Sequence, residues 1–237
     1  LNRGCPAIAV TRGGKVEELA RQHKAPVFPI GIECQPRAAL GYSLFPLLAF
    51  LQRLGLGPER GKAVGEAIEQ MRGMASLLAP ATPTSQNPAK QLAAAIGERV
   101  AVAYGAEHLA AVARRWKTQI NENAKSWAFA EALPEQNHNA IEGFNFPAPW
   151  DRMFVVLLRG SGYNSRVAQR IGLTQQALSR ARVPHQVLDA RGDDRLAQAM
   201  TMALLGDWVS YYLAIGRGVD PTPVPTLEWL KGQMGKG

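Results

Sequence analysis

A polar stretch from Arg115 to Phe144 concentrates the residue types that catalyse proton transfer. It holds four glutamates, two lysines, one histidine and four asparagines, and apolar runs flank it on both sides. Carboxylates and imidazoles are common general acids and bases, whereas fixed cations and amide groups stabilise negative charge that develops in a transition state. We therefore expect the chemistry of this chain to lie in this stretch.

The first candidate in the stretch is Glu122, which we expect at the end of a helix. Apolar side chains recur on one face between Ala106 and Asn123, a spacing that predicts a helix over these residues; they are Leu109, Val112, Ala113, Trp116 and Ile120. Glu122 then lies in the last turn, where the negative end of the helix dipole disfavours the charged form of a carboxylate. A general base needs that kind of tuning.

The second candidate is His138, which follows a predicted strand. The segment from Ser126 to Ala132 is short and largely apolar, with Trp127 and Phe129, and we predict it as a buried strand that ends at Pro134. Ligands of open α/β sheets gather at the carboxyl ends of strands. We therefore expect His138 at a position where a ligand could bind.

Each candidate also has an ordinary structural alternative. A glutamate at a helix end is usually solvated, and a single histidine is usually a surface or satisfied core residue. A catalytic site is favoured because further polar residues cluster with the two candidates. Asn123, Lys125 and Asn139 lie with Glu122 and His138 at the two ends of one predicted strand.

Composition narrows the class of protein. The chain has 237 residues, 46% of them hydrophobic, which suits a globular protein of one or two domains. The formal net charge is +8, and it fits either an anionic partner, such as a phosphorylated metabolite or a nucleic acid, or a solubilising surface charge. The longest apolar run, Leu44 to Leu51, is too short to span a bilayer, so we expect no membrane partner.

The two cysteines, Cys5 and Cys34, show no metal-ligand spacing and no disulfide framework. We therefore expect a reduced, cytoplasmic setting without a metal site.

The first part of the chain predicts a βαβ unit. Pro6 to Val10 is expected as a strand, Lys15 to His23 as a helix and Ala25 to Ile30 as a second strand, with a glycine turn between the first two. Arg37 follows, in the first turn of an expected helix near a strand end. It fits either an exposed surface charge or a cation that faces a site.

The remainder continues the α/β alternation. Helices are expected over Ala38–Leu54 and Gly61–Leu78, and the Pro-rich segment Ala79–Lys90 is the candidate domain boundary. A short helix over Gln91–Ile96 precedes a second α/β layer, whose expected elements are the strands Arg99–Tyr104, Met153–Leu158 and Val183–Leu188 and the helices Ser165–Arg180 and Asp194–Ala214. A last short helix, Leu227–Met234, carries Lys231, which alone would be taken for an exposed surface lysine.

One segment favours a different class of protein. Arg166 to Arg180 is similar to a DNA-reading helix-turn-helix, with Gly172 at the expected turn position. Apolar strands flank it, however, which favours a crossover helix of the sheet. The preceding loop, Gly160 to Ser165, fits either a plain loop or a phosphate cradle made of backbone amides.

With these residues laid out, the chain resembles the bifunctional phosphoglucose/phosphomannose isomerase family of double sugar-isomerase (SIS) domain proteins. The resemblance extends over nearly all of the chain, and the segments that carry it are GCPAIAVTRGGKVEELA, QPRAALGYSLFPLL, RWKTQINENAK, LPEQNHNAIEGF and LLGDWVSYYLAIGRGVDPTPVPTLEWLK. It implies two three-layer α/β/α SIS domains with parallel sheets. We expect them at residues 1–85, the first one lacking its amino part, and at residues 86–237, the second one with a carboxyl-terminal helix.

The resemblance implies an aldose-ketose interconversion of fructose 6-phosphate with glucose 6-phosphate, mannose 6-phosphate or both, without a cofactor or metal. It implies that Glu122 moves a proton between the first two carbons through a cis-enediolate. It also implies that His138 opens the sugar ring from the neighbouring subunit of a homodimer. Arg37 would stabilise the enediolate oxygens, and Lys231 would assist ring opening or contact the sugar. The alternative from another class is a non-catalytic SIS-type regulator that binds phosphosugar or DNA.

The chain departs from the family pattern in one respect. Members of the family carry a Ser/Thr-rich phosphate loop in the first SIS domain, upstream of where this sequence begins. We therefore expect weak or no activity from these 237 residues alone. Whether glucose or mannose phosphate is preferred is left open, because the two sugars share the proton transfer and differ only in configuration at the second carbon.

Overall fold

The computed structural model describes residues 5–145 and 150–235, in two compact units. Unit 1 covers Leu1–Gly61 and unit 2 covers Lys62–Gly237. This division lies upstream of the domain boundary that we predict between residues 85 and 86, and that boundary stays a prediction. In the described residues, no helix has both the length and the apolar character that crossing a membrane requires.

Unit 1 contains the predicted βαβ unit. The strands β1 (Ala9–Thr11) and β2 (Val27–Pro29) pair in parallel, and the helix α1 (Gly14–Gln22) connects them. Gly13, directly before α1, and Gly14, its first residue, both have positive φ angles, a conformation that other residues adopt only with strain. Both strands are shorter than the apolar runs suggest. A 3-10 turn (η1, Pro36–Ala38) then leads into the helix α2 (Leu40–Arg53).

Unit 2 is built on a four-stranded sheet in which every neighbouring pair is parallel. The strand order is β4-β3-β5-β6, and the bounds are β3 Val100–Ala106, β4 Ala128–Leu133, β5 Met153–Arg159 and β6 His185–Asp189. The central strands β3 and β5 are buried along almost their whole length, because helices cover both faces of the sheet.

The helices of unit 2 are α3 Gly61–Leu78, α4 Pro88–Ile96, α5 Ala110–Asn123, α6 Ser165–Arg180, α7 Arg195–Gly216 and α8 Pro225–Met234. Short 3-10 turns lie between them: η2 Thr84–Gln86, η3 Glu107–Leu109, η4 Glu135–His138, η5 Glu142–Asn145 and η6 Trp150–Arg152.

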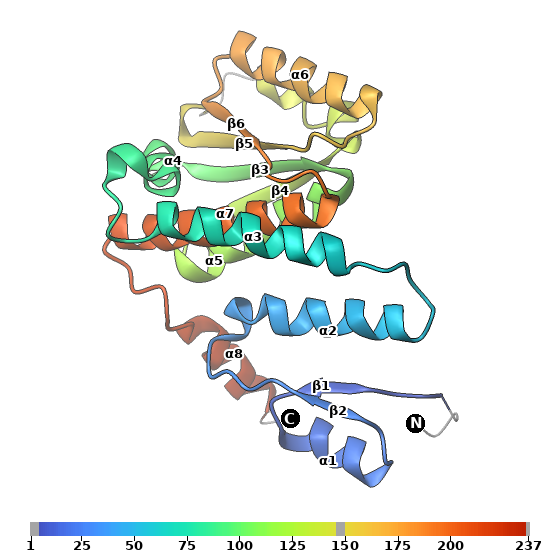
Figure 1. The fold of residues 1–237 in the computed structure, drawn as a ribbon. Coiled ribbons are helices and arrows are strands. Elements are labelled where there is room, and N and C mark those ends of the chain that lie inside the picture. The colour runs from blue at the N-terminus through green and yellow to red at the C-terminus, as the bar shows by residue number, and fades with distance from the viewer. Residues whose placement is uncertain (1–4, 146–149, 236–237) are drawn as a thin grey trace. The chain divides into compact units, whose positions relative to one another are not determined.

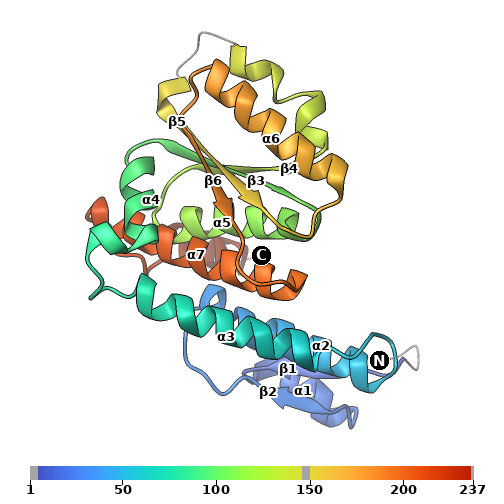
Figure 2. The same ribbon diagram turned by 45° about the horizontal axis from the view of Figure 1, so that its top comes forward.

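The two faces of the sheet carry different helices. α5 packs on β3 and β4, and α7 packs on α5 and α4, whereas α6 packs on β4, β5 and β6. Figure 1 shows α6 on one side of the sheet and α5 with α7 on the other, and the turned view in Figure 2 agrees. This arrangement follows from right-handed crossovers. The chain moves outward from β3 to β4 and then back across the sheet to β5 and β6, so its connections must change face.

In unit 2, one expectation is wrong and one disfavoured alternative is excluded. β4 is an edge strand, and it is not buried: Trp127, just before it, is 75% exposed and Phe129 is 46% exposed. The segment Arg166–Arg180 belongs to one continuous helix, α6, without a turn at Gly172, so the structure contradicts a helix-turn-helix. The expected crossover helix between parallel strands is confirmed there.

Candidate active site

Glu122 lies in the last turn of α5, as predicted, and is half-buried. The side chain of Lys125 closes this helix end, because its Nζ donates a hydrogen bond to the backbone oxygen of Glu122 and another, of 3.1 Å, to the backbone oxygen of Pro221. The end of α5 is thereby tied to the connection between α7 and α8.

The two asparagines beside Glu122 connect the end of α5 to two different parts of the chain. Asn121 Nδ2 donates to the backbone oxygen of Ser126 at 2.7 Å, so it fixes the turn into β4. Asn123 Nδ2 donates to Ser210 Oγ of α7 at 2.8 Å. Helix ends normally fray, and these contacts oppose fraying at the residue where a catalytic carboxylate is expected.

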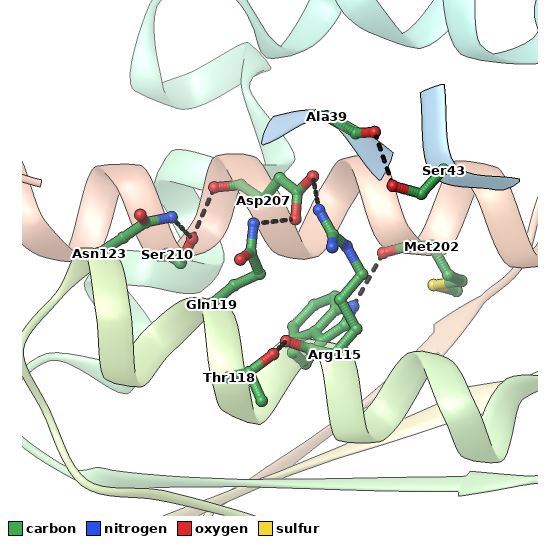
Figure 3. A network of polar contacts seen from close by, with 10 residues as sticks. Ala39, Ser43, Arg115, Thr118, Gln119, Asn123, Met202, Asp207 and Ser210 are labelled. Atoms are coloured by element: carbon green, nitrogen blue, oxygen red, sulfur yellow. Dashed lines mark hydrogen bonds and ion pairs between the residues drawn. The ribbon is translucent and has the colours of Figure 1, made fainter. Parts of the chain in front are cut away.

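A polar network continues along α5 from this end (Figure 3). Arg115 Nη2 and Gln119 Nε2 donate to the two carboxylate oxygens of Asp207 at 2.8 Å and 2.7 Å. Burial raises the pKa of Asp207, while its contacts to Arg115 and Gln119 act in the opposite direction. Asp207 is therefore a partly buried acid whose carboxylate accepts hydrogen bonds from both Arg115 and Gln119.

His138 ends η4, directly after β4, and its side chain is exposed. Its neighbours anchor the turn to α6 and the sheet. Asn137 Nδ2 donates to Thr174 Oγ1 of α6 at 2.9 Å, and Arg170 Nη1 donates to Asn137 Oδ1 at 3.3 Å. Gln136 is fully buried, and its Oε1 accepts a hydrogen bond from Asn137 Nδ2 at 2.7 Å. Burial raises the pKa of the nearby Tyr104 phenol to about 12.

One chain therefore keeps Glu122 and His138 apart. Glu122 lies in the last turn of α5, before β4, whereas His138 ends η4, after β4. The 6 residues of β4 lie between them, and an extended strand of that length spans about 20 Å. The two predicted residues do not meet within one copy of the chain.

The other two predicted residues lie elsewhere. Arg37 is in η1 of unit 1, so its membership of a common site with Glu122 stays a prediction. Lys231 is exposed in the last turn of α8, a helix without a single buried residue. In the part of the chain that the structure describes, no group of three or more histidine, cysteine or acidic side chains could hold a metal ion.

The loop after β5 already holds an anionic group of the chain itself. Its backbone amide at Asn164 donates to Glu107 Oε1 at 2.7 Å, and Arg195 pairs with Glu107 Oε2 at 3.0 Å. A carboxylate thus occupies the position that a bound phosphate would need at the start of α6. This contact favours the plain loop over the phosphate cradle.

A cavity of about 620 Å³ lies between α4 and the last turns of α7. Lys90, Tyr211, Tyr212 and Arg217 contribute to its lining, whereas Glu122, His138 and Lys231 do not. Arg217 also donates to the backbone oxygen of Gly97, so the walls are tied together by contacts of the chain itself. The candidate catalytic residues therefore lie outside this cavity.

Sequence patterns offered no reason to single out Asp207 and Ser210 in advance, since their partners are 87 to 92 residues away. One signal was present: Asp207 is the one acidic residue in the apolar sequence of α7. An acid in such a helix is normally paired.

Comparison with known proteins places these features in a family. The family model of the bacterial phospho-glucose isomerase C-terminal SIS domain matches residues 85–234. A bifunctional phosphoglucose/phosphomannose isomerase from Caldicellulosiruptor bescii is 34% identical over 98% of this chain and 69% of its own length. The protein of the same name from Aquifex aeolicus is 30% identical over 100% of this chain and 70% of its own length.

A solved structure also agrees. The glucose-6-phosphate isomerase like protein from Thermus thermophilus superposes with a TM-score of 0.65 at 27% identity, over 92% of this chain and 74% of that one. The α/β architecture with parallel sheets is that of the SIS-domain proteins. The chain belongs to the bifunctional phosphoglucose/phosphomannose isomerase family.

Proposed function

We propose that the chain is an aldose-ketose isomerase that interconverts fructose 6-phosphate with glucose 6-phosphate, mannose 6-phosphate or both. The observation that carries this proposal is the placement of Glu122. Its carboxylate stands at the carboxyl end of α5, between two asparagines that fix the helix end. A general base for a C–H proton needs this kind of fixed position.

Glu122 acts as the base of the proposed reaction. Starting from the aldose, its carboxylate takes the proton from the second carbon, and the electron pair forms the double bond of a cis-enediolate. The same group returns the proton to the first carbon, while the hydroxyl proton moves between the two oxygens. Arg37 supplies the fixed cation that stabilises the enediolate oxygen. The reaction balances without an oxidant, because both redox changes occur within one sugar.

His138 opens the sugar ring from a second copy of the chain in this proposal. Its support is the separation of Glu122 and His138, which lie before and after β4, because a partner copy would overcome that separation. The exposed aromatic pair of Trp127 and Phe129 on edge strand β4, with ring centroids 6.0 Å apart, offers an apolar surface for that copy. Exposed apolar groups of this kind favour an interface.

Lys231 contacts the open-chain sugar or assists ring opening in this proposal, because α8 presents it on an exposed helix. The substrate places the chain in hexose phosphate metabolism, in glycolysis or gluconeogenesis. Cys5 and Cys34 are free thiols in the structure, and with the intracellular substrate class they support a cytoplasmic setting.

Replacement of the base tests the proposal. In the natural protein, Glu122→Gln keeps the shape of the side chain and removes the base, so kcat should fall by a factor of about 10² to 10⁴. The affinity for fructose 6-phosphate, measured by titration calorimetry, should stay nearly unchanged. Glu18→Gln, at an exposed position of α1, is the matched control and should keep full turnover. Full turnover in Glu122→Gln would refute the assignment of the base.

A further inference from the structure

Three side chains of α5 donate hydrogen bonds to α7, and we call this row of contacts the ladder. The last of the three side chains is Asn123, which is adjacent to the proposed base Glu122. Arg115, Gln119 and Asn123 recur at every fourth position, so they project from one face of α5. The first two donate to the carboxylate of Asp207, and the third donates to Ser210 Oγ (Figure 3).

Ser210 is oriented for this role. Its side chain is fully buried, and its hydroxyl donates to the backbone oxygen of Asp207 at 2.8 Å. The hydroxyl proton is thereby used within α7, and an oxygen lone pair is left to accept from Asn123 Nδ2. The buried hydroxyl thus has a defined direction, which a rotating surface serine would lack.

The ladder limits how α5 can move. Rotation of α5 about its axis would break three hydrogen bonds at once, and fraying of its last turn would break the Asn123 bond first. Glu122 lies one helical turn beyond Gln119 and directly beside Asn123, so either motion would displace its carboxylate. A general base that is misplaced by about 1 Å loses about 10²-fold in rate.

We propose that Ser210 and Asp207 are positioning residues for the isomerisation, because they hold the last turns of α5 and thereby fix the carboxylate of Glu122. This inference rests on the proposed function. None of the proposed catalytic residues lies on α7. By this inference, α7 nevertheless affects the rate of proton transfer, because its side chains hold the helix that carries the base.

The test compares two hydroxyl deletions on the same helix. Ser210→Ala removes the bond to Asn123, whereas Tyr212→Phe removes a 2.6 Å bond from α7 to the backbone oxygen of Leu78, on the side of α7 away from α5. Each change removes two part-buried hydrogen bonds of α7: Ser210 also donates to the backbone oxygen of Asp207, and the Tyr212 hydroxyl also accepts from Asn87 Nδ2 at 3.5 Å. A merely structural role therefore predicts similar effects of the two changes on turnover.

Positioning predicts a split between the two. Ser210→Ala should lower kcat for fructose 6-phosphate by about 10- to 100-fold with KM within about twofold of wild type, because the base is displaced and substrate binding is not. Tyr212→Phe should keep wild-type kcat. Ser210→Thr, which retains the hydroxyl, should recover most of the rate.

A double variant sharpens the result. Because Asn123 and Ser210 form one contact, Asn123→Ala with Ser210→Ala should lower kcat no further than either single change. Asp207→Asn keeps the size of the side chain and should lower kcat in the same direction. If Asp207→Asn does not fold, the Ser210 variants carry the test alone.

The outcomes separate the two proposals. Equal kcat values for Ser210→Ala and Tyr212→Phe in an active enzyme would overturn the positioning role and leave the isomerase function intact. A wild-type protein without isomerase turnover would refute the function and the positioning role together.

Discussion

Mixing two inactive variants tests whether His138 acts across subunits. One variant is Glu122→Gln, which keeps His138, and the other is His138→Ala, which keeps Glu122. Each homodimer lacks one residue in both of its sites. In a mixed dimer, the first chain supplies an intact His138 to the intact Glu122 of the second chain, so one of the two sites regains both residues.

The expected recovery follows from two-fold symmetry. Random pairing of equal amounts makes about half of the dimers mixed, and each of these has one working site of two, so the mixture should regain about one quarter of wild-type activity. Mixed dimers purified through two different affinity tags should reach about one half. The structure motivates this design, because one chain places Glu122 before β4 and His138 after it.

The assay is the rate of glucose 6-phosphate and mannose 6-phosphate formation from fructose 6-phosphate after co-expression. A control mixture of Glu122→Gln with the Glu122→Gln/His138→Ala double variant contains no intact base and should show no recovery. If purified mixed dimers of the two single variants also show none, His138 does not act from the partner, and the proposed site is wrong.

Three further changes probe other parts of the structure. Gly206→Ala would push a Cβ into the Trp116 indole and should lower the free energy of unfolding by about 1–3 kcal/mol in urea titrations, whereas Gly172→Ala, which faces open space, should not. Burial lowers the pKa of His108, so the unfolded chain takes up its proton more readily; Tm should fall as the pH drops below about 6.5, and by less in His108→Gln. Trp127→Glu should weaken the proposed dimer in sedimentation experiments, and an unchanged association constant would exclude this surface.

Local patterns predicted the elements well where the signals agreed. The expected bounds of Gly61–Leu78 and Ser165–Arg180 match α3 and α6, because the apolar period is clear and, in α6, Asn164 caps the first turn. The same pattern also permitted a helix-turn-helix, since a glycine can lie inside a continuous helix at a modest cost. The flanking apolar strands are what favoured a continuous crossover helix over a helix-turn-helix.

Strand order was beyond local patterns. The apolar run before Pro134 fits a central strand as well as an edge strand, and the exposure of Trp127 and Phe129 depends on β4 having only one neighbour. The same strand lies between Glu122, which precedes it, and His138, which follows it.

Long-range polar pairs were equally hidden. The carboxylate of Asp207 meets Arg115 across 92 residues, and no spacing rule links the two positions. The last turn of α5 could be placed from its apolar period, so the location of Glu122 was predictable. The groups on α7 that fix this turn became visible only in the folded chain.

The measurement that tests the central claim most directly is conversion of fructose 6-phosphate by the natural protein. Both products, glucose 6-phosphate and mannose 6-phosphate, are followed. We expect turnover to one or both of these products. Absence of both products would contradict the assignment of an aldose-ketose isomerase.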